Sequence, residues 1–137
     1  MGSNPIEPAY LFEIFNKLLK EHIFMLIKTI EEWKEQLQNS NKLIVVEGKK
    51  DKFALNSLNI KNIFVLNNKP LYQVVEEVAD ISKDVVILTD LDREGKKLYS
   101  ILQTDLQKNG VKVDKVFREF LIRNTKLVCI ESIENFF

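Results

Sequence analysis

Two stretches decide the fold of this chain, Leu43-Ile44-Val45-Val46-Glu47-Gly48 and Val85-Val86-Ile87-Leu88-Thr89-Asp90-Leu91-Asp92-Arg93-Glu94-Gly95. Each begins with a short apolar run, which is typical of a strand buried on both faces of a parallel sheet. Each then passes into acidic residues and a glycine. In an open α/β sheet, ligands bind beyond the carboxyl ends of the strands, where the strand order reverses. The two stretches therefore predict an α/β fold with a ligand site at that edge of the sheet.

The chain from residue 43 onward alternates short strands with helices. We expect strands at 43–47, 60–66, 85–89 and 113–117 and helices at 50–58, 70–80 and 93–108. A candidate fifth strand at 127–130 and a short last helix follow. Helices between successive strands imply right-handed crossovers and a parallel sheet. If Glu47 and Asp90 share one site, their strands must be neighbours, which predicts a four-stranded sheet in the order 2-1-3-4.

The segment 9–38 is expected to be helical, because apolar residues recur in it at three- and four-residue steps. An unbroken helix would be roughly 45 Å long at ~1.5 Å per residue, which is longer than a small domain needs. Three interpretations stay open. The first half projects and pairs with a protein partner or a second copy, or the chain folds back through a break near 22–25, or Met25 is the natural start. His22 is expected to be packed or at an interface. We divide the chain into an N-terminal helical extension, 1–40, and one domain, 41–137.

The composition limits the function classes. The chain has 137 residues, 45% of them hydrophobic, and a formal net charge of zero. There is thus no global basic field to draw it onto nucleic acid, and such binding must depend on local patches. The lone Cys129 excludes an internal disulfide and a multi-cysteine zinc site, which fits a reducing cytoplasm. The apolar stretch 23–27 is too short to span a membrane.

The carboxylates that follow the two apolar runs are candidate metal ligands. Glu47, Asp90, Asp92 and Glu94 would repel one another at one edge of the sheet unless a cation lay between them. Mg²⁺ takes carboxylate and water oxygens and is the expected ion, with Mn²⁺ as a substitute. A simpler interpretation of the second cluster is helix capping, since acidic residues are favoured at helix N-termini. Three acids within five residues exceed what capping needs.

Basic residues flank these acids at the first turns of two expected helices. Cations are not what a helix N-terminus prefers, so their placement favours contact with phosphate. The two glycines would let a nucleic-acid backbone approach closely. The expected nucleic-acid-binding residues are Lys49, Lys50, Arg93, Lys96, Lys97, Gly48 and Gly95. Lys52 is expected to be an ordinary solvated side chain.

The motifs Val45-Val46-Glu47-Gly48-Lys49-Lys50-Asp51 and Leu88-Thr89-Asp90-Leu91-Asp92-Arg93-Glu94-Gly95 resemble those of the Toprim domain. That domain occurs in type IA and type II topoisomerases, bacterial-type primases, ribonucleases that mature 5S ribosomal RNA, and overcoming-lysogenization-defect nucleases. The first motif is most similar to the primase and maturase versions, and the second to the type IA topoisomerase version. The resemblance covers roughly residues 42 to 118, and the small size resembles the stand-alone Toprim proteins of archaea and some bacteria.

The resemblance implies a Rossmann-like Toprim fold and a role for each acid. Glu47 matches the family's general acid or base, Asp90 and Asp92 match the aspartates that hold Mg²⁺, and Glu94 matches a further ligand of the topoisomerase version. The accessory regions of complete topoisomerases and primases are absent from this sequence. We therefore expect a Mg²⁺-dependent nucleic-acid phosphotransfer module, a nuclease or the catalytic subunit of an RNA- or DNA-processing complex. The alternative is a non-catalytic module that holds a metal and binds nucleic acid or a ribonucleoprotein.

Overall fold

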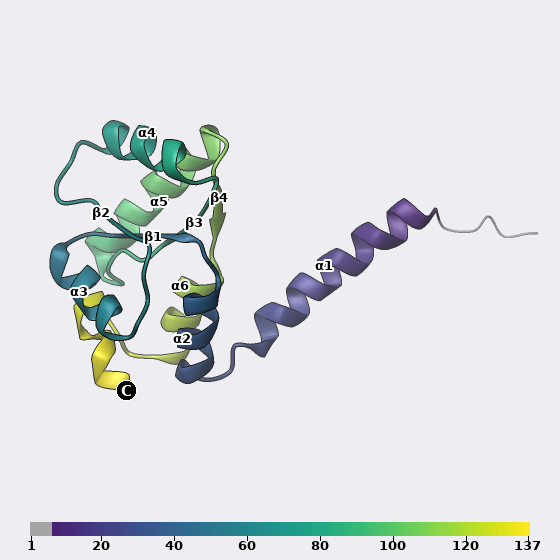
Figure 1. Cartoon of the computed structure of the whole chain (residues 1–137), viewed down its shortest axis with the longest axis horizontal. Coiled ribbons are helices and arrows are strands. Elements are labelled where there is room, and N and C mark those ends of the chain that lie inside the picture. The colour runs from purple at the N-terminus through teal and green to yellow at the C-terminus, as the bar shows by residue number, and fades with distance from the viewer. Residues whose placement is uncertain (1–6) are drawn as a thin grey trace, which may run out of the picture.

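Four parallel strands form one sheet in the order β2-β1-β3-β4 (Figure 1). In the computed structural model, residues 7–137 are described, with the side chains of 7–18 and 27–137. The strands are β1 (Leu43–Val46), β2 (Ile63–Val65), β3 (Asp84–Ile87) and β4 (Lys112–Asp114). The predicted α/β class and strand order are confirmed, so the carboxyl ends of β1 and β3 are adjacent.

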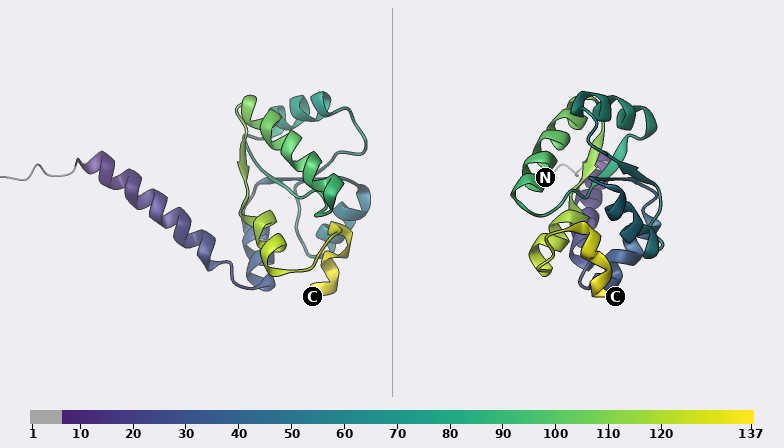
Figure 2. Two further views of the ribbon diagram at one scale, coloured as in Figure 1. Left: turned by 180° about the vertical axis from the view of Figure 1, so that it is seen from behind. Right: turned by 90° about the vertical axis from the view of Figure 1, so that its left-hand side faces the viewer.

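Helices cover both faces of the sheet (Figure 2). One face packs against α4 (Leu71–Ile81) and α5 (Arg93–Lys108). The other packs against α2 (Ile30–Asn39), α3 (Lys49–Ser57), α6 (Val116–Asn124) and the 3-10 helix η1 (Ile130–Phe136). Because successive strand residues point to opposite faces, Leu43 and Val45 lie in the first core and Ile44 and Val46 in the second. The central strands β1 and β3 are thus buried on both faces, as their apolar runs predict.

The N-terminal segment forms two helices, so the helical segment expected at 9–38 is interrupted and not continuous. The first, α1 (Pro8–Leu26), projects from the body, and α2 follows after a break at residues 27–29 (Figure 1). Thr29 caps α2 by accepting a hydrogen bond from the Glu32 amide at 3.1 Å, and the Glu32 carboxylate accepts one from the Lys28 amide at 2.7 Å. This Thr-x-x-Glu arrangement starts a new helix and explains the break. α1 continues through residues 22–25, so the break expected there as one alternative lies instead at 27–29, and the His22 side chain falls outside the residues whose side chains are described.

The second helix, α2, is part of the packed body. Trp33 is fully buried, and its indole N–H donates to the Phe117 carbonyl at 2.9 Å, which joins α2 to α6. Ile27 and Leu37 lie in the same core. Within the described residues, no helix is both long and apolar enough to cross a membrane.

The C-terminal part differs from the expectation in two places. The strand expected at 113–117 ends at Asp114, and α6 follows at once. The Asp114 carboxylate accepts a hydrogen bond from the Val116 amide at 2.9 Å, which helps to turn the chain into that helix. The candidate fifth strand at 127–130 is an irregular segment, joined to the loop after β3 by a bond from the Leu91 amide to the Val128 carbonyl, 2.7 Å.

Candidate functional site

Glu47 and Asp90 meet beyond the carboxyl ends of β1 and β3. The backbone N–H of Asp90 donates to Glu47 Oε2 at 2.7 Å, across 43 residues of sequence. The sheet pairing leads directly to this contact, since the Leu88 amide donates to the Val45 carbonyl just before it. The strand order thus places the Glu47 carboxylate against the loop that carries the aspartates, as the sequence predicts.

Asp92 sits at the N-cap of α5. Its Oδ1 accepts a hydrogen bond from the Gly95 amide at 2.7 Å, so the capping interpretation holds for one of its two oxygens. Gly95 is required here for steric reasons, because a Cβ at this position would lie 1.9 Å from the Asp90 carbonyl oxygen. The close approach that Gly95 permits is therefore between α5 and the Asp90 backbone. Thr89 adds a further bond, from its hydroxyl to the Gly95 carbonyl at 2.8 Å.

The segment before η1 closes the other side of the site. The Ile130 amide donates to Asp90 Oδ1 at 3.0 Å. The Leu91–Val128 bond lies beside it. Two backbone bonds from one irregular segment thus fix both the Asp90 side chain and the loop that bears it.

Arg118 supports the loop that carries Asp90. It is only 3% exposed, and its guanidinium donates to the carbonyl oxygens of Thr89 and of Asp90, the latter at 2.9 Å. The guanidinium also stacks 4.6 Å from the centre of the Tyr99 ring. Burial lowers the pKa of Arg118, while Tyr99, Glu47 and Asp90 act to raise it. The positive charge therefore lies near the carboxylates, but its hydrogen bonds go to carbonyls.

Two carboxyl groups at this edge have raised pKa values. Burial raises the pKa of Glu47 most, the bond from the Asp90 amide opposes this, and the charges of Asp90, Asp51 and Asp92 add to it. Burial likewise raises the pKa of Asp51, which is 7% exposed and accepts a bond from the Gly48 amide at 3.0 Å. Mutual repulsion among these acids shows that they lie within electrostatic reach of one another. Such an edge favours a bound cation.

The acids fit an ion that takes part of its coordination from elsewhere. No three acidic, histidine or cysteine groups in the described part of the chain converge closely enough to hold a metal by themselves. Glu47, Asp90 and Asp92 each use one oxygen in the hydrogen bonds above, which leaves a second oxygen on each. Mg²⁺ characteristically takes one or two carboxylates and completes its shell with waters and phosphate oxygens. The donor set suits that pattern and does not suit a cage built from protein alone.

The fourth predicted ligand lies apart from these acids. Glu94 is on the first turn of α5 with its side chain 82% exposed, 3.9 Å from Lys97 Nζ. It is not among the largest influences on the pKa of Glu47. The structure thus brings Glu47, Asp90 and Asp92 together and leaves Glu94 at the rim.

The predicted phosphate-binding side chains surround this edge. Lys49 and Lys50 are exposed on the first turn of α3, and Arg93, Lys96 and Lys97 are exposed on the first turn of α5. Lys52 is exposed too, as expected. A Cβ on Gly48 would meet only Asp51 Oδ2, at 3.9 Å, so this position is open. The basic residues are free to reach a ligand without rearranging the core.

Sequence reasoning missed two residues of the site. Asp51 lies in the first quoted motif, but nothing in the sequence shows that it is buried against its own helix start. Arg118 lies between apolar residues of a segment expected to be partly strand, and a lone arginine gives no signal of a buried role. A helical periodicity over 116–124 with Arg118 on the apolar face is the one pattern that could have found it.

Comparisons with known proteins identify the family of the chain. The model of the Toprim domain matches residues 41–117. A UPF0292 protein of Methanocaldococcus jannaschii is 33% identical over 82% of this chain and 90% of its own length. A UPF0292 protein of Methanosarcina barkeri is 33% identical over 88% of this chain and 83% of its own length. A solved structure of a protein from Aquifex aeolicus is 33% identical with a TM-score of 0.71, covering 77% of this chain and 98% of that one. The chain therefore belongs to the Toprim domain family and, within it, to the UPF0292 proteins.

Proposed function

We propose that this chain is a Mg²⁺-dependent phosphotransfer module for nucleic acid, acting as a nuclease or as the catalytic subunit of a nucleic-acid processing complex. The observation that carries the proposal is the contact of Glu47 with the Asp90 backbone, beside Asp92, at the carboxyl ends of neighbouring strands. Membership of the Toprim family supports it, because Toprim domains serve nucleic-acid processing and generally bind Mg²⁺. The lone cysteine agrees with a cytoplasmic setting for this role.

Glu47 is the proposed general acid or base. The Asp90 amide holds its Oε2, so the carboxylate keeps one orientation while Oε1 is left to take or give a proton. A raised pKa brings a glutamate closer to the pH at which it transfers protons efficiently. The bond from the Asp90 amide opposes this rise.

Asp90 and Asp92 are the proposed holders of the ion, with Glu47 beside them. The ion that they would hold would supply stabilisation of the charge that develops on a reacting phosphate. The bonds from the Ile130 and Gly95 amides fix one oxygen of each aspartate and so restrict the orientation of each carboxylate. The second oxygen of each would then bind a ligand at a small cost in conformational entropy. The exposed lysines on α3 and α5 would contact the flanking phosphates and give salt-dependent affinity.

A cleavage assay tests the proposal. Labelled single-stranded, duplex and structured RNA and DNA are incubated with the protein in Mg²⁺, Mn²⁺ or EDTA, next to Glu47→Gln and Asp92→Asn. Both substitutions keep an oxygen that can accept the native hydrogen bond, so the fold should survive. Metal-dependent cleavage by wild type that both variants lose is the expected result. Wild type that cleaves none of the substrates with either metal contradicts an independent nuclease.

A non-catalytic role is the second candidate, and one observation favours it. The described carboxylates do not by themselves complete a metal site, so an ion here would be structural, and the domain would bind a nucleic acid or ribonucleoprotein through other surfaces without turnover. Equal nucleic-acid binding by wild type and Asp92→Asn, with no cleavage by either, is the result that this candidate requires.

We also propose that α1 binds a protein partner or a second copy of the chain. Its described part exposes a run of large apolar side chains, namely Tyr10, Leu11, Phe12, Ile14, Phe15 and Leu18. Such a concentration on a projecting helix is typical of an interaction surface. A partner bound to α1 would supply additional contacts to a substrate, which a single domain of this size lacks.

A further inference from the structure

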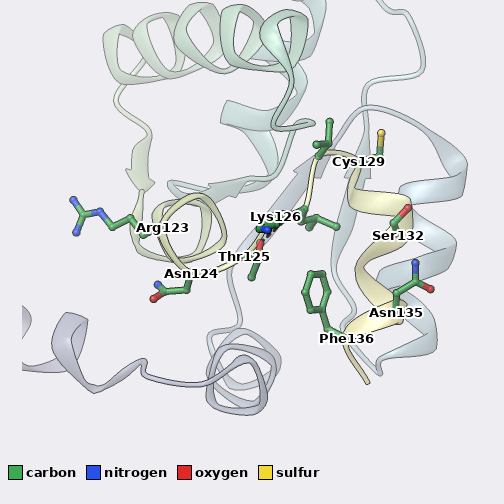
Figure 3. Close-up of a pocket in the computed structure, with 10 residues that line it drawn as sticks. Arg123, Asn124, Thr125, Lys126, Cys129, Ser132, Asn135 and Phe136 are labelled. Carbon is green, nitrogen blue, oxygen red and sulfur yellow. Dashed lines mark hydrogen bonds between the residues drawn. The ribbon is translucent and has the colours of Figure 1, made fainter.

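A groove of about 770 Å³ lies between the end of α6 and η1 (Figure 3). One wall consists of the end of α6 and the irregular segment that follows it, residues 123–129. The other wall is formed by Ser132, Asn135 and Phe136 of η1. In Figure 3 the Phe136 ring reaches from η1 toward Thr125 and Lys126. Nothing in the functions discussed above uses this groove.

The lining of the groove is cationic, although the whole chain has no net charge. Its charged members are Lys126 and Arg123, the latter 3.9 Å from Glu119 of the same helix, and among the residues that the structure describes no acidic one lines the groove. Amide and hydroxyl groups of Asn124, Thr125 and Ser132 supply further hydrogen-bonding capacity. Phe136 is 37% exposed, which leaves part of an aromatic face open beside these polar groups. Positive charge, adaptable polar side chains and an open aromatic ring together match a strand of phosphates and unpaired bases.

The groove shares a wall with the acidic site. Its segment around Val128 accepts the bond from the Leu91 amide, and the next residues donate from Ile130 to Asp90 Oδ1. Cys129, which lines the groove, lies within electrostatic reach of Asp90 and Asp92. A strand lying in the groove would therefore end beside the carboxylates.

A second groove, of about 640 Å³, extends the same track around η1. It shares Ser132 and Asn135 with the first groove and adds Lys49, Lys50 and Phe53 from α3. Phe53 is 74% exposed, which is unusual for a phenylalanine. Glu131 and Glu134 also line this second groove, so phosphate contact is favoured in the first.

We propose that the groove between α6 and η1 binds single-stranded nucleic acid and leads it to the acidic site. Phosphates would lie along Lys126, and a base would stack on Phe136. Double-stranded substrates are disfavoured because a paired base has no free face for the ring. This inference rests on the proposed function for its direction toward Asp90, but its binding step needs no catalysis.

Binding in EDTA tests the groove apart from the chemistry. Fluorescence anisotropy of labelled oligothymidylate and oligouridylate is measured with wild type, Phe136→Ala and Lys126→Glu. Loss of one stacking platform should weaken binding about five-fold or more. The Lys126→Glu chain should bind more weakly and lose about 0.7 from the slope of log affinity against log salt. The matched controls are Tyr72→Ala and Lys108→Glu, exposed on α4 and α5 at the opposite face, and both should bind like wild type.

The native thiol gives a second measurement that needs no substitution. Cys129 is the one cysteine of the chain and lines the groove, so a bound oligonucleotide should slow its reaction with a maleimide. A duplex of the same length should protect it less. An unchanged reaction rate at oligonucleotide concentrations that saturate the anisotropy signal would place the ligand elsewhere and overturn the assignment.

The outcomes separate this inference from the proposed function. Groove-dependent binding in EDTA without cleavage in Mg²⁺ supports the groove and removes the nuclease. Cleavage with unchanged binding by Phe136→Ala and Lys126→Glu overturns the groove and leaves the nuclease standing. A wild-type chain that binds neither oligonucleotide also overturns the groove, and leaves this surface for a protein.

Discussion

The molecule holds two groups of acidic side chains, and it treats them in opposite ways. Around Lys42, just before β1, the Asp114 carboxylate lies 2.6 Å and the Asp84 carboxylate 3.6 Å from the Lys42 ammonium. Beyond the carboxyl ends of β1 and β3, Glu47 and Asp90 also have a buried cation nearby, Arg118, but it donates to backbone carbonyls. In the first group a lysine ammonium is paired directly with both carboxylates. In the second, burial raises the pKa of Glu47 most and the charges of Asp90, Asp51 and Asp92 add to the rise, a setting that favours the binding of an external cation.

The largest expected effect comes from removing the buried cation itself. Arg118→Met leaves the Thr89 and Asp90 carbonyls without donors and removes a charge that offsets the carboxylates. We expect a loss of about 3 kcal/mol in the free energy of unfolding, measured by urea denaturation. Arg123→Met, at an exposed arginine of the same helix, is the control and should change stability by less than about 0.5 kcal/mol. Equal effects of the two substitutions would show that Arg118 does not hold the loop.

Removing the cation of the first group should cost less. Asp84 Oδ1 is buried without a hydrogen-bond partner, so Lys42 is the charge that compensates it. Lys42→Met should lower the free energy of unfolding by about 1–2 kcal/mol, measured by the same denaturation. Lys69→Met, which breaks an exposed pair with Glu77, serves as the comparison and should cost about 0.5 kcal/mol or less. An unchanged free energy of unfolding for Lys42→Met would mean that the Asp84 and Asp114 carboxylates tolerate their mutual repulsion without a cation, as the second group is expected to do.

Mg²⁺ should stabilise the second group where no side chain does. At Mg²⁺ concentrations about ten times the dissociation constant, wild type should gain about 1.4 kcal/mol relative to EDTA. Asp92→Asn should lose most of this gain, because it removes one negative ligand and keeps the cap of α5. The readout is the midpoint of thermal unfolding. The same titration of Glu94→Gln tests the exposed fourth ligand, and a full response there would exclude Glu94 from the coordination shell.

A smaller gain is expected from neutralising the second group. The raised pKa values of Glu47 and Asp51 mean that each contributes stability that is fully present below the ordinary carboxyl pKa and lost as the pH rises through the raised one. Glu47→Gln and Asp51→Asn should therefore be more stable than wild type in EDTA near neutral pH, by less than about 1 kcal/mol after solvent screening. The gain should shrink toward about pH 4. Destabilisation by both substitutions at neutral pH would refute the repulsion.

The smallest effect on stability is expected far from either group. Deleting residues 1–24 removes most of α1 and should leave the unfolding midpoint almost unchanged, because the packed core begins at Ile27. The molecular mass from light scattering should fall if α1 joins two copies. An identical oligomeric state with and without these residues would exclude a homodimer through α1.

The sheet could be predicted because its signals are local. Apolar runs of four to five residues ending in acids mark β1 and β3, and the demand that Glu47 and Asp90 meet fixes the order of the strands. The break before α2 was also readable from Thr29 and Glu32, a capping pair that lies inside a continuous apolar periodicity. Because the apolar periodicity of 9–38 runs straight through this pair, the periodicity alone does not reveal the break.

The rest of the site depends on tertiary contacts that leave no trace in spacing. Arg118 contacts the Thr89 carbonyl across 29 residues, and Ile130 contacts Asp90 across 40. Both use backbone atoms on one side of the bond, so the identity of the partner residue carries no information. The carboxylates could be found from the sequence because their chemistry lies in their side chains.

The bond from the Ile130 amide to Asp90 also has a consequence for synthesis on the ribosome. Translation releases the strands from residue 43 to residue 114 before it releases the segment that ties the Asp90 loop. A nascent chain can therefore form its sheet while the aspartate still lacks this bond and η1 is absent. The acidic site is complete only once residues 128–130 have packed beside the Asp90 loop, so its formation depends on a segment that is synthesised after all four strands.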